Sequence, residues 1–170
     1  MLLDFSNLNP AYLVGAIGIG VEWWAYYCES GRRFRFWSAL GALLWAMQYG
    51  LLGAWTAGLT MAATALRTCL SGILVTDRYK GFISLVFLLG FVVLTYYSWQ
   101  GPVSLLPAFA VCNTTVALFH FDNRSMRIGL LASSLAWIAN DWFWQAWPAL
   151  LAEAVAMLIN SYTIRKLMQH

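Results

Sequence analysis

GFISLVFLLGFVVLTYYS, residues 81–98, is an apolar stretch without a single charged side chain. About 20 such residues cross the hydrocarbon core of a bilayer as a helix, because each residue adds about 1.5 Å of length. Arg78 and Lys80 lie just before the stretch, and Trp99 follows it. The whole chain has the same character, with 61% hydrophobic and only 10% charged residues among 170. The composition therefore predicts an all-α membrane protein.

Three further apolar runs of similar length lie on each side of this central stretch. The runs before it cover approximately residues 11–28, 36–53 and 56–75, and the runs after it cover 102–119, 127–144 and 148–166. Charged residues, glycine or proline separate the runs from one another. The sequence thus predicts seven transmembrane helices in a single transmembrane domain over residues 1–170.

The basic residues lie in alternate joints between the predicted helices. The first, third and fifth joints and the C-terminal end together contain Arg32, Arg33, Arg35, Arg78, Lys80, Arg124, Arg127, Arg165 and Lys166. The second, fourth and sixth joints contain no Lys or Arg. Because basic joints stay in the cytoplasm, we expect the N-terminus outside and the C-terminus in the cytoplasm. Topology explains these charges, so we expect the lipid bilayer as a partner and no nucleic acid.

A shift of 92 residues aligns residues 12–68 with residues 104–160 without a gap. Rare residues give this alignment its weight, since Leu and Ala match by chance in any apolar chain. The rare pairs are Trp45 with Trp137, Trp55 with Trp147, Arg32 with Arg124, and Arg35 with Arg127. We therefore predict a parallel 3+1+3 repeat of three-helix bundles, with repeat one over about residues 11–75, a linker helix over about 81–98 and repeat two over about 102–166.

Two ionisable residues of the first repeat fall deep inside predicted helices. Glu22 and Arg67 each lie about eleven residues from the outer ends of their helices, which places both about 17 Å deep. In one interpretation they form a buried ion pair that only stabilises the first bundle. In the other, Arg67 binds an anionic group of a substrate, and Glu22 is its partner in the empty state.

Glu153 is the third ionisable residue inside a predicted helix, and the repeat pairs it with the apolar Met61. It lies about 9 Å below the outer surface, where Arg67 is the one basic residue that could approach it. Glu153 is then either a proton-coupling carboxyl group or an interfacial residue that reaches water. Asp141 lies nearer the outer surface, and we expect it to be solvated and to belong to no site.

Trp45 and Trp137 lie near the middle of their predicted helices, at matched positions of the two repeats. Gln48 and Asn140 follow three residues later, on the same helical faces. If these faces line the central axis, two indole rings and two amides surround a cavity suited to a small molecule. The alternative is that the tryptophans face lipid or pack together, and that the amides bond across helices.

Three more residues complete the predicted site. Asn160, which the repeat pairs with Thr68, lies deeper toward the cytoplasm and is a further candidate for substrate binding. Gly15 and Pro107 occupy matched positions in the first helix of each repeat, where they predict hinges. The cysteines show no spacing typical of a metal site, so we expect neither a metal nor another cofactor.

Four stretches of the sequence resemble the YgjV-type family of bacterial inner-membrane proteins. They are ALRT at residues 65–68, VSLLPAFAVCNTTVALF at 103–119, WIANDWFWQAW at 137–147 and AEAVAMLIN at 152–160. The resemblance implies a location in the bacterial inner membrane, with the N-terminus periplasmic. The 3+1+3 layout is also similar to that of the SWEET sugar transporters and the PQ-loop proteins, which suggests transport by analogy of architecture.

The leading functional prediction is a small-molecule transporter that works by alternating access around a midplane site between the two repeats. The aromatic residues suit a sugar or a vitamin-like compound, and Arg67 suits an anionic metabolite. The alternative is a non-transporting membrane scaffold or accessory subunit whose buried charges are structural. We expect no enzyme, because no Ser or Cys has an evident base nearby. The protein is predicted to be a monomer or a homodimer.

Overall fold

The computed structural model describes residues 9–28, 30–74, 79–121 and 123–167. These residues form seven α-helices, one short 3-10 helix and no β-strand, so the predicted all-α fold with seven helices is confirmed. Arg78, which was used to orient the chain, lies outside the described residues. The helices are α1 (Pro10–Tyr27), α2 (Gly31–Leu51), α3 (Trp55–Leu74), α4 (Lys80–Tyr97), η2 (Pro102–Ser104), α5 (Leu105–His120), α6 (Asn123–Phe143) and α7 (Trp147–Leu167).

Helices α2 and α6 begin several residues before the predicted starts at 36 and 127. They start at Gly31 and Asn123, so the arginine-bearing segments belong to the helices rather than to the joints. The side chains of Arg32 and Arg33 are exposed there. The predicted helix limits were those of the apolar runs, which end at the first charged residue. A helix can extend beyond its apolar run when its charged side chains reach water.

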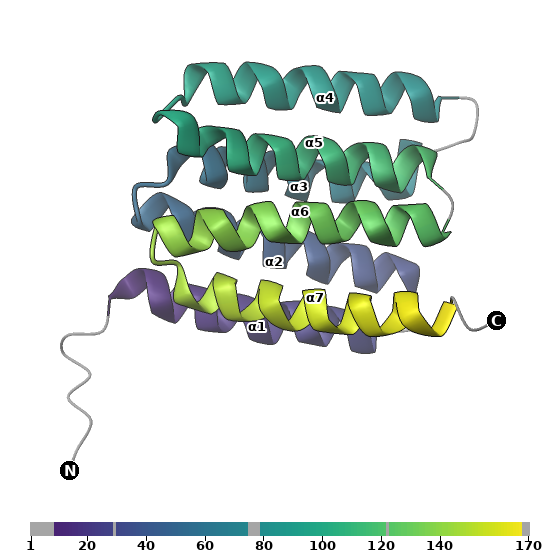
Figure 1. The fold of residues 1–170 in the computed structure, drawn as a ribbon, viewed down its shortest axis with the longest axis horizontal. Coiled ribbons are helices and arrows are strands. Elements are labelled where there is room, and N and C mark those ends of the chain that lie inside the picture. Colours follow the sequence, from purple (N-terminus) through teal and green to yellow (C-terminus); the bar gives the residue numbers. More distant parts are fainter. Residues whose placement is uncertain (1–8, 29, 75–78, 122, 168–170) are drawn as a thin grey trace, which may run out of the picture.

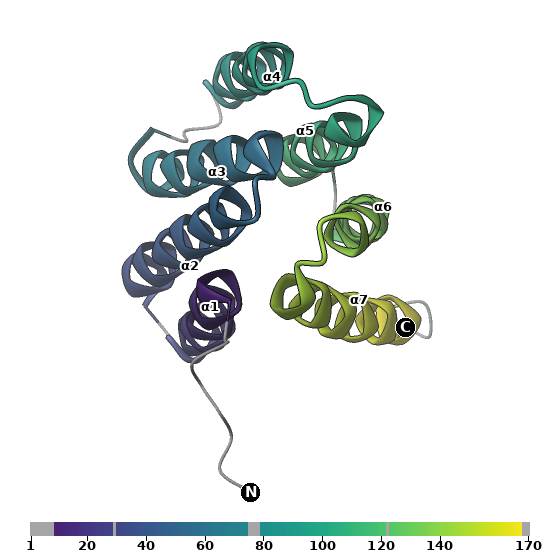
Figure 2. The same ribbon diagram turned by 90° about the vertical axis from the view of Figure 1, so that its left-hand side faces the viewer.

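Six of the helices form a ring when the molecule is viewed along the helix axes (Figure 2). Around the ring, α1 contacts α2, α2 contacts α3, α3 contacts α5, α5 contacts α6, α6 contacts α7, and α7 contacts α1. Helix α4 lies outside the ring, against α3 and α5 (Figures 1 and 2). We call α1–α3 the first bundle and α5–α7 the second bundle.

The packing is the reverse of that in a water-soluble protein. Alanine dominates the buried apolar residues, whereas many large apolar side chains are exposed, including Phe82 at 69% and Val92 at 60% on α4. Small residues let helices approach closely, and large apolar side chains on the outside suit contact with lipid. By length and composition, two helical segments of the described chain are apolar enough to cross a membrane: Lys80–Tyr97 and Pro102–His120.

Matching turns connect the second and third helices of the two bundles. In the first bundle, Gly53 has a φ of 78° and the amide of Ala54 donates to the carbonyl of Tyr49 over 2.8 Å. In the second bundle, Gln145 has a φ of 53° and the amide of Ala146 donates to the carbonyl of Asp141, also over 2.8 Å. Both are Schellman turns, in which a left-handed residue lets late amides satisfy the last helical carbonyls.

Polar side chains tie the α4–α5 connection to the start of α3. The hydroxyl of Thr56 donates to the carbonyl of Ser98 over 2.6 Å and lies 3.0 Å from the hydroxyl of Ser104. The side-chain amide of Gln100 donates to the carbonyl of Gly53 over 2.7 Å. Thr56 and Ser104 are each 2% exposed, so these bonds satisfy groups that water does not reach.

Candidate functional site

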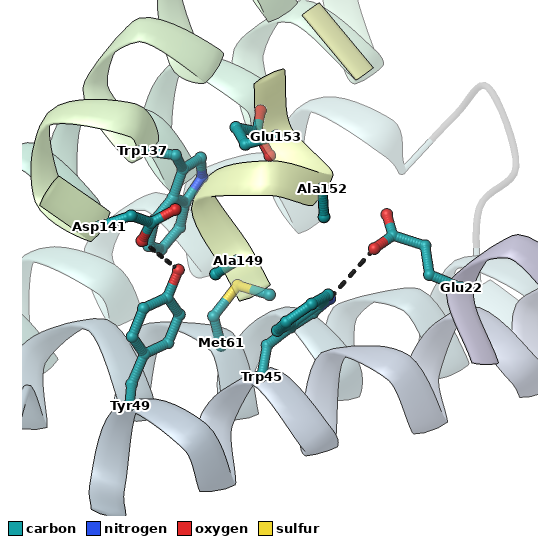
Figure 3. A pocket seen from close by; sticks show the side chains of 9 residues that line it. All are labelled: Glu22, Trp45, Tyr49, Met61, Trp137, Asp141, Ala149, Ala152 and Glu153. Atoms are coloured by element: carbon teal, nitrogen blue, oxygen red, sulfur yellow. Dashed lines mark hydrogen bonds between the residues drawn. The ribbon is translucent and has the colours of Figure 1, made fainter. Parts of the chain in front are cut away.

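A cavity of about 100 Å³ lies inside the ring, between the two bundles (Figure 3). The first bundle contributes Glu22, Trp45, Tyr49 and Met61 to its wall, and the second bundle contributes Trp137, Asp141, Ala149, Ala152 and Glu153. Helices α1, α2, α3, α6 and α7 therefore all reach the cavity.

Most of the wall consists of residues that the 92-residue shift relates to one another. Trp45 corresponds to Trp137, Tyr49 corresponds to Asp141, and residue 61 corresponds to residue 153. The paired positions occupy similar places in the two bundles but differ in chemistry. The first bundle presents a phenol and a thioether where the second presents two carboxyl groups. The two halves of the cavity are thus matched in position but not in chemistry.

Glu22 is held at the cavity by a tryptophan of the neighbouring helix. The indole nitrogen of Trp45 on α2 donates to a carboxyl oxygen of Glu22 on α1 over 3.1 Å (Figure 3). Trp45 is only 6% exposed, so its ring is fixed by packing as well as by this bond. Gly18 of α1 lies against this ring, and a Cβ at that position would be in ordinary van der Waals contact with it at 3.4 Å.

Asp141 belongs to the cavity, and the prediction that it is solvated is wrong. It is 1% exposed and accepts a hydrogen bond of 2.6 Å from the hydroxyl of Tyr49 (Figure 3). The Tyr49 ring in turn stacks on Trp137, with ring centroids 5.8 Å apart and 16° between the planes. Depth along the helix suggested exposure, but Asp141 faces into the ring. Sequence reasoning missed Tyr49 as well, although the repeat pairs these two positions.

Glu153 reaches the same cavity from α7. The expected approach of Arg67 is absent, since the wall contains no Lys, Arg or His. Three carboxyl groups thus face one cavity without a basic residue among them.

Arg67 lies elsewhere, between α3, α4 and α5. It is 7% exposed, its guanidinium donates to the hydroxyl of Thr115 over 2.6 Å, and it lies 6.0 Å from the centroid of the Phe91 ring. The predicted ion pair with Glu22 is therefore not formed. The two residues have similar depths, but α2 separates their helices around the ring. Glu22 bonds to α2, and Arg67 bonds to α5.

The predicted amide pair is buried beside the cavity wall without being part of it. Gln48 and Asn140 are 0% and 1% exposed, and each precedes a wall residue in the sequence. Asn140 donates to the carboxyl group of Asp141 over 3.3 Å. The side-chain nitrogen and oxygen of Gln48 and the side-chain oxygen of Asn140 have no hydrogen-bond partner among the described protein atoms. Buried polar atoms are seldom left unpaired, so these require water or a ligand.

Asn160 is also away from the cavity. Its side-chain oxygen accepts from Arg127 over 3.2 Å, and its nitrogen donates to the backbone carbonyl of Arg127 over 2.9 Å. The two bonds link α7 to α6, so the local geometry gives Asn160 a structural role.

The two predicted hinge residues lie in tight surroundings. A Cβ on Gly15 would overlap the side chain of Gln48 and come within 2.7 Å of Pro148, so the glycine permits close contact of α1 with α2 and α7. Pro107 is fully buried in the first turn of α5, directly after η2. A hinge role for either residue stays a prediction.

No three His, Cys, Asp or Glu side chains lie close enough together to hold a metal ion in the described part of the chain. The cavity wall offers instead carboxyl groups, aromatic faces and a thioether. These groups can bind a small molecule through charge, hydrogen bonds and ring contacts.

A helical ring that buries alanine, exposes large apolar side chains and, among its described residues, turns the carboxyl groups toward an internal cavity has the features of an integral membrane protein. The chain belongs to the Imp-YgjV family, described as bacterial inner membrane protein, whose model matches residues 10–170. The resemblance to this family and the inner-membrane location are thereby confirmed. No curated protein and no solved structure matches the chain.

Proposed function

We propose that this protein transports a small molecule across the bacterial inner membrane, by alternating access of the cavity to the two sides. One observation carries the proposal: the cavity lies between the two bundles and is lined by matched positions of both. A relative movement of the bundles would therefore reshape the cavity directly. Transporters with parallel repeats bind substrate near the midplane at such a junction.

The 3+1+3 parallel repeat is part of this proposal, and several features support it. Helices α2 and α6 both start and end 92 residues apart, and α3 and α7 start 92 residues apart. The two Schellman turns share their hydrogen-bond pattern. The contact of α1 with α7 corresponds to the contact of α5 with α3 when the bundles are exchanged. Helix α4 would then be the linker helix of a SWEET-like arrangement.

Seven crossings of the membrane, with a periplasmic N-terminus and a cytoplasmic C-terminus, follow from the same proposal. A C-terminal fusion to green fluorescent protein should fluoresce, and a fusion to alkaline phosphatase should be inactive, because phosphatase folds only in the periplasm. An active phosphatase fusion together with a green fluorescent protein fusion that does not fluoresce would show that the C-terminus is periplasmic, contrary to the proposal.

The charge of the cavity argues against a scaffold with purely structural carboxyl groups. A scaffold needs a filled interior, and burying carboxyl groups around an open space costs stability that a few apolar side chains would restore. We expect a protein to keep such destabilising carboxyl groups where they act on a ligand. No enzymatic activity is proposed, and a monomer or a homodimer is compatible with a cavity inside one chain.

Water access to the cavity tests the proposal. Cys28, Cys69 and Cys112 are first replaced by Ser, and a single cysteine is then placed at Ala152 in the cavity wall or at its neighbour Leu151, which is 56% exposed on the outside. We expect a membrane-impermeant maleimide to label Ala152→Cys both in spheroplasts and in inside-out vesicles. Leu151→Cys should remain unlabelled, because it faces lipid.

Two results would contradict alternating access. Labelling of Ala152→Cys from neither side would mean that water never enters the cavity, as the scaffold alternative predicts. Labelling from one side only, under every condition tried, would indicate a fixed vestibule rather than a transport pathway.

A further inference from the structure

The cavity holds acidic side chains for which its wall offers no basic partner. Glu22, Asp141 and Glu153 reach it from three helices, and no basic residue is among its lining residues (Figure 3). The donors that bond to Glu22 and Asp141 are neutral groups: an indole, a phenol hydroxyl and an amide. In a low-dielectric interior a bound cation favours the ionised form of such carboxyl groups and is attracted by it, whereas an anion is repelled.

The remaining wall is largely aromatic, which suits an organic cation. The rings of Trp45, Tyr49 and Trp137 all line the cavity. The face of an aromatic ring attracts a cation within about 6 Å through its quadrupole, and the attraction strengthens when water is excluded. Carboxyl groups together with several aromatic rings recognise ammonium groups by charge and by shape.

A bare metal ion fits this arrangement less well. The carboxyl groups do not converge on one point, since no three acidic, His or Cys side chains of the described segments are close enough to share an ion. They are spread around a cavity of about 100 Å³. A cation with a body of several atoms can contact separated carboxyl groups, whereas a single ion cannot.

A buried acceptor lies beside the wall of the cavity, outside the residues that line it. Asn140 is 1% exposed, and its nitrogen bonds to the cavity residue Asp141. Its oxygen is buried without any partner among the described protein atoms. That oxygen is an acceptor, so an N–H donor or a water bound to one would satisfy it.

We propose that the cavity binds a small organic ammonium compound, with its charged head among the carboxyl groups and the aromatic rings. The proposal deepens the transport function and rests on it for the role of the ligand as substrate. Binding itself does not require transport. An anionic substrate finds no counterpart in this cavity, because Arg67 is bonded to Thr115 outside it.

Two probes of nearly equal shape test the charge requirement. Choline and 3,3-dimethylbutan-1-ol differ in that a quaternary nitrogen replaces a carbon, so the comparison isolates one positive charge. Binding of each is measured by titration calorimetry on the purified full chain in lipid nanodiscs. We expect choline to bind more tightly than the neutral alcohol by about tenfold or more. Equal affinity, or displacement of choline by an equal concentration of sodium ions, would overturn the proposal.

Variants that remove charge and keep shape locate the site. Glu153→Gln and Glu22→Gln should each weaken choline binding by about tenfold and leave the neutral alcohol unaffected. Leu151→Ala, on the exposed outer face of α7, changes neither the wall nor its charge and should leave the preference for choline intact. If one Gln variant fails to fold, as judged by thermal unfolding, the other still decides. A preference for choline that survives the loss of either carboxyl group would place the binding elsewhere and refute the assignment.

Failure of this inference can be told apart from failure of the transport proposal. Choline binding together with an Ala152→Cys that no side can label would support the cation site and reject alternating access. Labelling from both sides without choline binding would support the transport pathway and reject the cation as its substrate.

Discussion

Gln145→Gly is expected to stabilise the protein by about 1 kcal/mol. Gln145 has a φ of 53°, in the left-handed region, where a side chain costs about 1–2 kcal/mol relative to glycine. Glycine also loosens the unfolded chain, which offsets about 0.4–1 kcal/mol of the gain. The side chain of Gln145 is exposed, so its removal loses little packing. The difference between the two effects leaves about 1 kcal/mol in favour of the variant.

Gly53→Gln is the matched reverse experiment. Gly53 holds the same place in the turn of the first bundle, with a φ of 78° and the same hydrogen-bond pattern. The side chain should therefore cost about what its removal from position 145 gains. Thermal unfolding of the purified protein in detergent should show a rise of Tm by about 2–4 °C for Gln145→Gly and a fall of similar size for Gly53→Gln.

The variant that combines Gln145→Gly with Gly53→Gln tests whether the two turns are equivalent. If the two turns are equivalent, exchanging their residues should leave Tm close to that of the natural sequence, because distant sites add. A lower Tm for Gln145→Gly alone would show that the Gln side chain stabilises the turn by more than its backbone strain costs. A double variant far from the natural Tm would argue against equivalent turns, and hence against the proposed repeat.

Two further predictions concern packing and hydrogen bonding, and both are read from thermal unfolding in detergent. Gly15→Ala should destabilise the protein by about 1–3 kcal/mol, because its Cβ would overlap Gln48, whereas Gly20→Ala on the same helix has open space and should be neutral or stabilising by up to about 1 kcal/mol. An equal loss in both glycine variants would contradict the close contact. Thr115→Val should cost about 1–3 kcal/mol, because it leaves a buried donor of Arg67 unpaired. No change would mean that water takes the place of the hydroxyl.

The helices could be predicted from the sequence because their signals are local. Apolar runs and the residues that interrupt them define each helix. The starts of α2 and α6 were missed because the helices continue through the arginine-bearing segments that precede the apolar runs. The symmetric tryptophans, Trp45 and Trp137, could be assigned to a cavity because the repeat compares two faces of one chain. Their role in binding substrate remains a proposal.

The errors at the site have one physical cause. Counting residues gives the depth of a side chain along a helix, but not the direction in which it points around the helix axis. Depth alone suggested a Glu22–Arg67 pair and a solvated Asp141. The order of helices in the ring separates Glu22 from Arg67. The orientation of α6 about its axis buries Asp141. That order depends on packing between distant segments, which no local pattern in the sequence records.

Two of the described links between the bundles lie toward one end of the ring, whereas the bond from Arg67 of α3 to Thr115 of α5 lies past the middle of both helices. Tyr49 bonds to Asp141 near the ends of α2 and α6, and Thr56 at the start of α3 bonds to the connection that leads into α5. The two bundles could then rotate relative to each other about this end. A helix of 20 residues is about 30 Å long, so a rotation of about 10° at this end would move the opposite tips apart by about 5 Å. Opening toward the arginine-bearing helix ends would therefore disturb the joined end little, but it would stretch the bond between Arg67 and Thr115.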